Sequence, residues 1–147
     1  MKGKKVPIEF SIRAAREGDA DDVGALYSQM CPDVSNIDRD FRAILADPRA
    51  GCLILEAGSS PVGMIVWYVR STLSSGRKMV IDELVIDHEC RRQGLGMRLL
   101  DHCIGLAREQ GLDSVEVGCS LVKTGLHRFY ERAGLKHRMR LYAMLLN

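Results

Sequence analysis

Apolar and polar residues alternate along residues 8–13, and this period of two predicts a first strand with one buried face. Farther on, apolar residues return every three or four positions between Asp19 and Pro32, and again between Ser35 and Asp47. This spacing puts them on one face of a helix, so we predict two helices, with Asp19 as the N-cap of the first. The chain therefore begins with a strand that is followed by two helices.

The middle of the chain has the pattern of strands joined by tight turns. Residues 52–57 and 62–71 are rich in apolar and β-branched side chains, and the Gly-Ser-Ser-Pro sequence between them favours a hairpin turn. A second polar loop leads into another β-branched run, residues 79–86. Consecutive strands with short connections pair antiparallel, so we predict an antiparallel meander.

The second half alternates between helix and strand. The apolar spacing predicts helices at residues 94–110 and about 123–132, and strands at residues 114–119 and 138–146. Because a helix connects them, strand 114–119 should pair parallel to strand 79–86. We therefore predict an α/β (α+β) fold with about four helices and a mixed, mostly antiparallel sheet of about six strands.

We predict one domain over residues 1–147, because the sequence has no linker, repeat or low-complexity segment. A hydrophobic content of 46% and a charged content of 27% are ordinary for a soluble globular protein. The net charge of +2 and the lack of long basic runs give no reason to expect a nucleic-acid partner. No stretch approaches the ~18 apolar residues of a membrane span, so no membrane partner is expected.

The five cysteines indicate a reducing compartment. Their number is odd, and none of them has the close spacing typical of a zinc site or of a disulfide framework. We therefore expect free thiols, no metal ion and a cytoplasmic location. The cysteines are Cys31, Cys52, Cys90, Cys103 and Cys119.

The most informative stretch joins strand 79–86 to the helix that follows. Gly94 and Gly96 lie in this turn, where the missing Cβ atoms let backbone N–H groups approach a bulky anion at the helix N-terminus. Two other phosphate-binding motifs do not fit, because a dinucleotide-binding motif needs glycine at the position of Leu99 and the chain has no Gly-Lys-Ser/Thr triplet. The alternative is a glycine turn that only connects a strand to a helix.

The same turn resembles a known family. Arg91, Gly94 and Gly96 match the Arg/Gln-x-x-Gly-x-Gly/Ala signature of the GNAT superfamily of acyl-CoA-dependent N-acyltransferases, and residues 127–135 resemble its F-Y-x-x-x-G-F segment. The resemblance implies acetyl-CoA as cosubstrate and a sheet that splays open beside the glycine turn. The strand backbone would then bind the pantetheine arm, and the turn would bind the pyrophosphate. The implied binding residues are Leu84, Val85 and Ile86 on the strand and Arg91, Arg92, Gln93, Gly94, Leu95, Gly96 and Met97 at the turn.

Two acidic residues and one tyrosine are candidates for the catalytic steps. Asp82 and Glu83 interrupt an apolar strand, where a buried carboxylate needs a reason. By resemblance, one of them accepts the amine proton; their side chains alternate across the strand, so only one should face the site, and we favour Asp82. Tyr130 matches the family's tyrosine that protonates the leaving sulfur, and a phenol of pKa ~10 carries the necessary proton at neutral pH. Covalent catalysis by Cys119 is the alternative.

The acceptor is less closely defined by the sequence. Tyr27, Met30 and Phe41 are expected over one end of the sheet, where the family forms its acceptor pocket, although they could equally be core residues. The C-terminal block resembles that of enzymes that acetylate small amines such as aminoalkylphosphonates or polyamines. The resemblance thus implies an N-acetyltransferase acting on a primary amine of a small molecule. A protein or peptide acceptor and a CoA-binding regulatory module without turnover are the alternatives, and a homodimer is left open.

Overall fold

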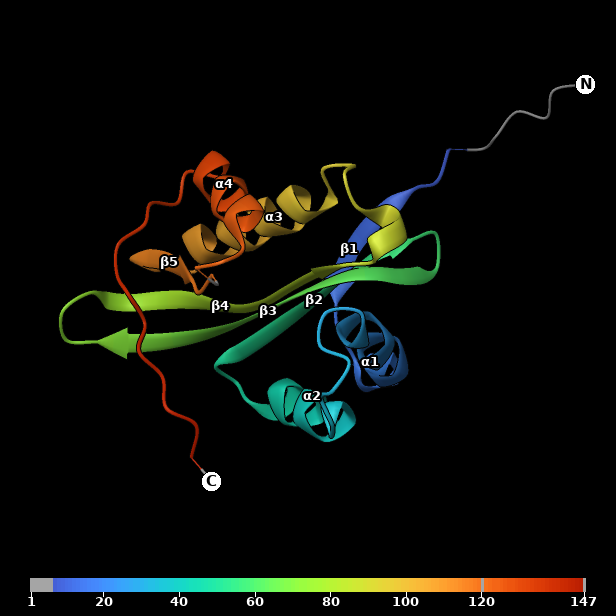
Figure 1. Cartoon of the computed structure of the whole chain (residues 1–147), viewed down its shortest axis with the longest axis horizontal. Coiled ribbons are helices and arrows are strands. Elements are labelled where there is room, and N and C mark those ends of the chain that lie inside the picture. The colour runs from blue at the N-terminus through green and yellow to red at the C-terminus, as the bar shows by residue number, and fades with distance from the viewer. Residues whose placement is uncertain (1–6, 120, 147) are drawn as a thin grey trace, which may run out of the picture.

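The computed structural model describes residues 7–119 and 121–146, and its centre is one five-stranded mixed sheet (Figure 1). The strands follow one another in space in chain order, and the first four pair antiparallel. The last strand pairs parallel to the fourth, as the helical connection between them requires. The strands are β1 (Phe10–Ala14), β2 (Ala50–Ala57), β3 (Ser60–Thr72), β4 (Gly76–Ile86) and β5 (Ser114–Val117).

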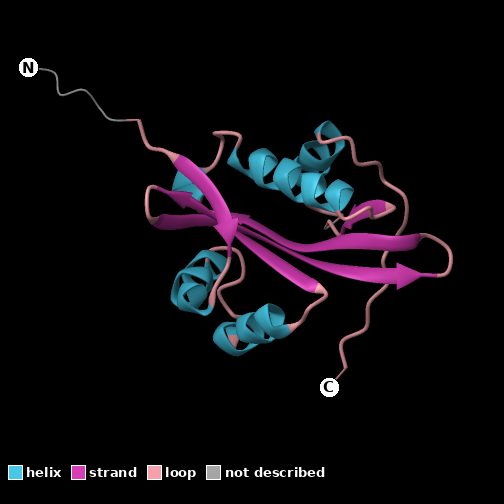
Figure 2. Ribbon diagram, turned by 180° about the vertical axis from the view of Figure 1, so that it is seen from behind, coloured by secondary structure: helices cyan, strands magenta, loops and turns pink. Residues whose placement is uncertain are grey.

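Helices cover both faces of the sheet, as Figures 1 and 2 show from opposite sides. One face carries the two helices that precede β2, α1 (Ala20–Ser28) and α2 (Ile37–Ala46). The other face carries α3 (Leu95–Glu109) and α4 (Thr124–Arg132). The predicted α/β (α+β) fold with four helices is therefore confirmed.

The apolar stripe of α3 forms the larger core with the sheet. Leu99, Leu100 and Cys103 have no exposed surface, and they share one cluster with the fully buried Ile65 and Met79 of the strands. Burial of side chains of this size contributes about 1.5–3 kcal/mol each. A second cluster on the opposite face joins α1 and α2 to the sheet through Val23, Leu26, Phe41, Ile54, Met64, Val66 and Val85.

A β-bulge in β4 changes which side chains face each layer. Val66 lies opposite Glu83 and Trp67 lies opposite Ile81, so Asp82 is the extra residue of the bulge. Before the bulge, Ile81 packs under α3, whereas Val85, four positions later, packs in the cluster under α1 and α2. The bulge therefore turns the odd-numbered positions of β4 from one face of the sheet to the other.

The two parallel strands are joined at one end only. β5 pairs with β4 from Lys78 to Ile81, and the rest of β4 continues without this neighbour. The paired end is held by the buried Lys78, whose Nζ lies 2.6 Å from Oε1 of Glu116, and by Asp113, whose carboxylate accepts from the N–H of Arg77 at 2.8 Å. The sheet thus splays open from residue 82 onward, as the family resemblance implied.

Asp19 lies just before α1, but its side chain does not cap the helix as predicted. Its two carboxylate oxygens accept from the guanidinium of Arg13 at 2.8 and 2.7 Å, and one also accepts from the N–H of Arg16 at 2.9 Å. The guanidinium holds the pKa of Asp19 below its usual range. The predicted partner of Asp19 is wrong because the charged guanidinium of Arg13, on β1, competes with the N–H groups of the helix for its carboxylate.

The predicted strand at residues 138–146 is wrong, since residues 135–146 contain neither helix nor strand. This segment leaves α4 and runs toward the side of the sheet that carries α2 (Figures 1 and 2). A strand forms only against a partner edge, and β5 has only four residues and ends at Val117 rather than at residue 119. The sheet consequently has five strands instead of about six.

Candidate active site

The bulge in β4 gives the two candidate carboxylates different surroundings. Glu83 is half-buried on the face covered by α1, and its Oε1 accepts a hydrogen bond of 3.3 Å from the hydroxyl of Tyr27. Asp82 is exposed. The geometry therefore favours Glu83, the alternative in the sequence interpretation, as the carboxylate that faces a site under α1.

Burial changes the protonation of these groups. Desolvation raises the pKa of Glu83 above its usual value. The hydrogen bond from Tyr27 opposes this rise, and the charge of Asp82 adds to it. Desolvation also raises the pKa of Tyr27, to about 12, with a further contribution from the charge of Glu83. Asp82 is exposed as a residue, but partial desolvation of its carboxyl raises the pKa. The positive charge of Arg70 lowers this pKa and so opposes the rise. At neutral pH the hydroxyl of Tyr27 therefore stays protonated, and it donates a hydrogen bond to Glu83.

Glu83 borders a cavity of about 150 Å³ between the sheet and helices α1 and α2. Tyr27 and Phe41, which were candidates for an acceptor pocket, both line it, and Met30 does not. Its walls are otherwise mostly aliphatic. The lining residues are Val23, Tyr27, Val34, Ile37, Asp40, Phe41, Ile44, Met64, Val66 and Glu83.

The glycine turn has the backbone of an anion cradle. Gly94 has φ +76°, and no heavy atom lies within 4 Å of the place where a Cβ would be. Arg92 also has a left-handed φ, +62°. The first hydrogen bond of α3 runs from the N–H of Arg98 to the carbonyl of Gly94 at 3.0 Å, so the N–H groups of Leu95 and Gly96 precede it without intrahelical acceptors. These groups and the helix dipole can bind a phosphate.

Side chains fix this turn to the rest of the fold. The Nε of Arg91 donates to the carbonyl of Ile86 at 3.0 Å, which closes the loop between β4 and α3. Gln29, directly after α1, donates to the carboxylate of Asp87 at 3.1 Å and accepts from the N–H of His88 at 3.0 Å. Sequence analysis missed Gln29, because no local pattern shows that the end of α1 reaches this loop.

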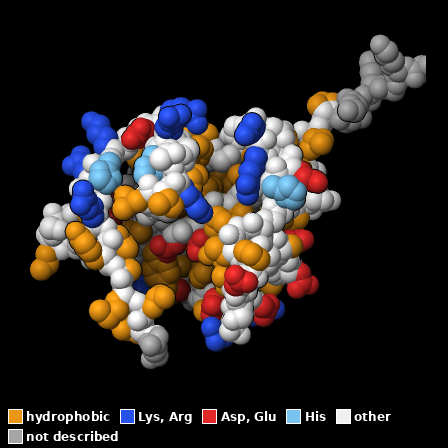
Figure 3. Space-filling view, viewed as in Figure 1, with side chains coloured by type: hydrophobic (Ala, Val, Ile, Leu, Met, Phe, Trp, Pro, Cys, Tyr) orange, Lys and Arg blue, Asp and Glu red, His pale blue; other side chains and the backbone are white. Residues whose placement is uncertain are grey.

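Basic side chains lie around the glycine turn and over helices α3 and α4. Figure 3 shows Lys and Arg gathered over α3, α4 and the segment that follows, above a hollow in which apolar and acidic side chains are visible. The predicted side chains Arg91, Arg92 and Gln93 are all exposed at the turn. An anionic ligand would therefore approach a favourable charge here.

Tyr130 lies on α4, which packs against the start of α3. Its ring makes an edge contact with Phe129 at a centroid distance of 5.1 Å, and a Cβ on Gly96 would lie 3.5 Å from the Phe129 ring. Burial raises the pKa of Tyr130 to about 12, and the nearby Cys119 contributes to the rise. Tyr130 therefore carries a proton at neutral pH, as a general acid must.

The environment of Cys119 does not favour covalent catalysis. Burial raises the pKa of its thiol, and this effect exceeds the lowering by the charge of Lys123. A nucleophilic cysteine needs a lowered pKa, because the thiolate is the reactive form. The alternative in which Cys119 carries the acyl group gains no support.

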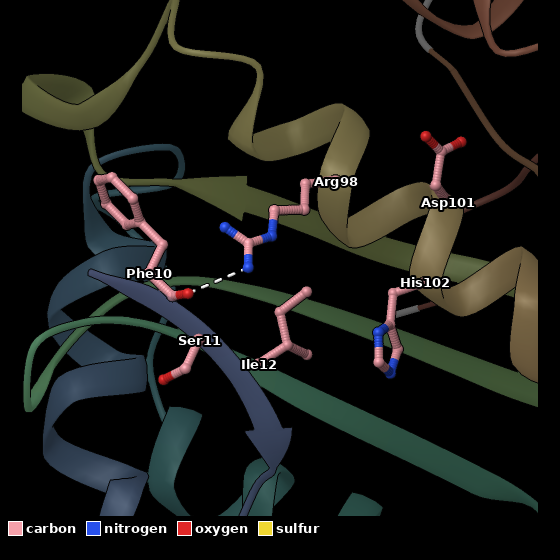
Figure 4. Close-up of a pocket in the computed structure, with 6 residues that line it drawn as sticks. All are labelled: Phe10, Ser11, Ile12, Arg98, Asp101 and His102. Atoms are coloured by element: carbon pink, nitrogen blue, oxygen red, sulfur yellow. Dashed lines mark hydrogen bonds between the residues drawn. The ribbon is translucent and has the colours of Figure 1, made fainter. Parts of the chain in front are cut away.

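A second and wider groove, of about 560 Å³, lies between β1 and α3 (Figure 4). Arg98 crosses it and donates to the carbonyl of Phe10 at 3.0 Å. The other lining residues are Ser11, Ile12, Asp101 and His102. None of the predicted site residues lines this groove, and the described part of the chain holds no cluster of acidic, cysteine or histidine residues that could bind a metal. Within the described residues, no helix has the length and apolar character needed to cross a membrane.

Comparison with known proteins identifies the family of the chain. Residues 20–135 match the Acetyltransferase (GNAT) family. An aminoalkylphosphonate N-acetyltransferase of Salmonella typhimurium is 30% identical over 128 residues, which cover 82% of this chain and 83% of the relative.

Two solved structures show the same fold. A transcriptional regulator from Bacillus halodurans superposes with a TM-score of 0.86 at 22% identity over 94% of this chain and 100% of the other. An aminoglycoside N-acetyltransferase in complex with CoA superposes with a TM-score of 0.85 at 14% identity over 97% of each chain. Because the family match spans most of the sequence, the chain belongs to the acetyltransferase (GNAT) family and is an acyl-CoA-dependent N-acetyltransferase.

Proposed function

We propose that this protein transfers the acetyl group of acetyl-CoA directly to a primary amine of a small molecule. The observation that carries the proposal is the bulge at Asp82, which directs Glu83 into a cavity under α1 and α2 just where β4 separates from β5. The anion cradle follows on the same strand, so a donor in the splay and an acceptor in the cavity would meet at Glu83.

The donor would be held by the backbone of β4 and by the glycine turn. Leu84, Val85 and Ile86 pair with β3 on one side, and their other edge is open to the amides of a pantetheine arm. The residues proposed for the pyrophosphate are those predicted, from Arg91 to Met97. When bound, acetyl-CoA supplies the thioester carbonyl that the amine attacks.

The base of the proposed reaction is Glu83. A primary amine of pKa ~10 is mostly protonated at neutral pH, so it must lose a proton before it can attack. A base works best when its pKa lies near the working pH, and burial moves the pKa of Glu83 in that direction. The exposed Asp82, preferred on the sequence, would contribute charge to this environment instead.

The acid of the proposed reaction is Tyr130. As the new C–N bond forms and the C–S bond breaks, the phenol gives its proton to the leaving sulfur, and the phenolate later regains one from solvent. The ammonium form of the acceptor loses two protons in all, one to Glu83 before the attack and one from the nitrogen once the C–N bond has formed. Tyr130 supplies one proton to the thiol, and the net second proton is released to solvent, which balances the transfer. The raised pKa of Tyr130 keeps the phenol protonated beforehand.

An assay of thiol release with DTNB tests the proposal. The protein is mixed with acetyl-CoA and a panel of small primary amines, a matched peptide panel with free N-termini, or no acceptor. We expect thiol release, and N-acetylated product by mass spectrometry, with small amines only. Transfer to peptides in preference to small amines would overturn the assignment of the acceptor, and binding of acetyl-CoA without any transfer would overturn the enzymatic role of the site.

Substitution of Gly94 by aspartate is expected to weaken acetyl-CoA binding more than tenfold, measured by calorimetry. The new carboxylate would face the pyrophosphate, and like charges in a cradle repel. Gly94→Asn is the matched control, because asparagine has the same shape and both residues tolerate the left-handed backbone of φ +76°. Equal affinities for the two folded variants, with folding checked by circular dichroism, would contradict the assignment of the phosphate site.

We also propose that the chain forms a homodimer through residues 138–146. This segment exposes six large apolar side chains, and β5 has only β4 beside it among the described residues. Residues 138–146 have strand composition but pair with no strand that the structure describes, and β5 has an open edge. Both features fit an exchange of strands between two copies of the chain. The exposed side chains are Met139, Leu141, Tyr142, Met144, Leu145 and Leu146.

Light scattering during gel filtration is expected to give a dimer for the unchanged chain and a monomer for the double variant Leu141→Asp, Leu145→Asp. Charges at these positions would enter the apolar contact unpaired. Leu121→Asp is the control, since Leu121 is exposed but lies outside the segment. A monomer for the unchanged chain at assay concentrations would refute the proposed dimer.

A further inference from the structure

We infer that the acceptor is a primary amine carried on a compact apolar body, with no anionic group close to the amine. The inference rests on the proposed function, because it concerns the same cavity. It goes further by naming the chemistry that the cavity selects and the chemistry that it rejects.

The shape and lining of the cavity support an apolar body. Its walls include Phe41, Met64 and Val66, each at most 3% exposed, which come from α2 and β3. The volume of about 150 Å³ is large enough for a group the size of a benzene ring. An apolar group that enters the cavity would leave water and gain contact with these buried walls.

The charges around the cavity support a cationic head. Glu83 and Asp40 are the two carboxylates of its lining, and the lining includes no lysine, arginine or histidine. Nearby arginines on α2 already have partners, since Arg39 bonds to Asp40 at 2.9 Å and Arg42 bonds to Asp38 at 3.1 Å. A phosphonate or carboxylate on the acceptor would lose its water without gaining a cation.

The hydrogen bond from Tyr27 orients the head group. Tyr27 donates to Oε1 of Glu83, which leaves the remaining acceptor positions of the carboxylate for an ammonium group. The amine would thus lie at Glu83 and its apolar body would point toward α2. This arrangement differs from what the name of the Salmonella typhimurium relative suggests, because its substrate carries a phosphonate.

The test compares two amines that share a two-carbon linker. 2-Phenylethylamine ends in an apolar ring, and 2-aminoethylphosphonate ends in an anion, so the pair differs only in the group that would enter the cavity. We expect kcat/KM to be at least about 100-fold higher for 2-phenylethylamine, because a buried anion without a partner is strongly disfavoured. Putrescine is the third probe, and it should be poorer than 2-phenylethylamine because its second ammonium group would lose its water among the mostly aliphatic walls.

A charge variant gives a second, independent readout. Val34 lines the cavity but is 44% exposed, so Val34→Arg offers a cation at its edge with little risk to folding. We expect this change to narrow the preference for 2-phenylethylamine over 2-aminoethylphosphonate at least tenfold. Ala43→Arg is the control, because Ala43 is exposed on α2 and does not line the cavity.

The outcomes separate this inference from the function on which it rests. If small amines are acetylated but 2-aminoethylphosphonate or putrescine is used as well as 2-phenylethylamine, the apolar class of acceptor is wrong and the proposed function stands. If Val34→Arg and Ala43→Arg shift the preference equally, the cavity is not the acceptor site. If no amine is acetylated although acetyl-CoA binds, the proposed function fails and this inference fails with it.

Discussion

Replacement of Glu83 by glutamine is expected to lower kcat by a factor of ~100 to 10,000, the usual contribution of a general base. Glutamine keeps the volume of the side chain and can still accept the hydrogen bond from Tyr27, but it cannot take a proton from the amine. Acetyl-CoA affinity and thermal stability should change little. The measurement is steady-state turnover with a good amine, together with calorimetry for acetyl-CoA.

The pH dependence provides a sharper test of the same role. Glu83 can act only when deprotonated, so kcat/KM of the unchanged enzyme should fall as the pH drops through the pKa of this carboxyl. Because burial raises that pKa, the fall should begin at a higher pH than an exposed glutamate would give. In Glu83→Gln this limb should disappear, and the residual rate should grow with pH as the free amine becomes abundant.

Asp82→Asn is the control for the Glu83 variant. Asp82 is exposed in the bulge. We expect Asp82→Asn to reduce turnover only a few-fold, because it removes a negative charge near Glu83 but not the base itself. A larger loss in Asp82→Asn than in Glu83→Gln would return the role of the base to Asp82.

The choice between these two acids shows where sequence interpretation stops. Strand alternation predicts that the side chains of Asp82 and Glu83 point to opposite faces of the sheet. It cannot say which face each one takes, because a bulge adds one residue and exchanges the faces of all positions after it. Ile81 and Val85 have the same parity yet pack in different clusters, and only the register against Val66 and Trp67 reveals this.

The parts of the fold that depend on local pattern were predictable. The stripe of α3, the meander of β2, β3 and β4, and the turn at Gly94 are all confirmed, since each is encoded within a few consecutive residues. The errors concern partners that are distant in sequence. Asp19 bonds to Arg13 rather than to the helix, and residues 138–146 have strand composition without an edge to pair with.

Tyr130→Phe is expected to reduce turnover about 100-fold, the low end of what a general acid contributes, because a thiolate is a tolerable leaving group near neutral pH. Phenylalanine keeps the ring that packs against Phe129, so stability and acetyl-CoA affinity should hardly change. Loss of kcat alone would separate a chemical role from a packing role. Tyr142→Phe is the control, since Tyr142 is 88% exposed and lies outside the proposed site.

The raised pKa of Tyr130 adds a second expectation for this variant. With a pKa of about 12 the phenol stays protonated through the usual assay range, so the loss of rate in Tyr130→Phe should be nearly constant from neutral pH up to about pH 10. A loss that vanished at high pH would indicate a group of ordinary acidity instead. If Tyr130→Phe keeps the turnover of the unchanged enzyme under conditions where chemistry limits the rate, Tyr130 is a core aromatic residue, and the leaving sulfur takes its proton from water or from another donor.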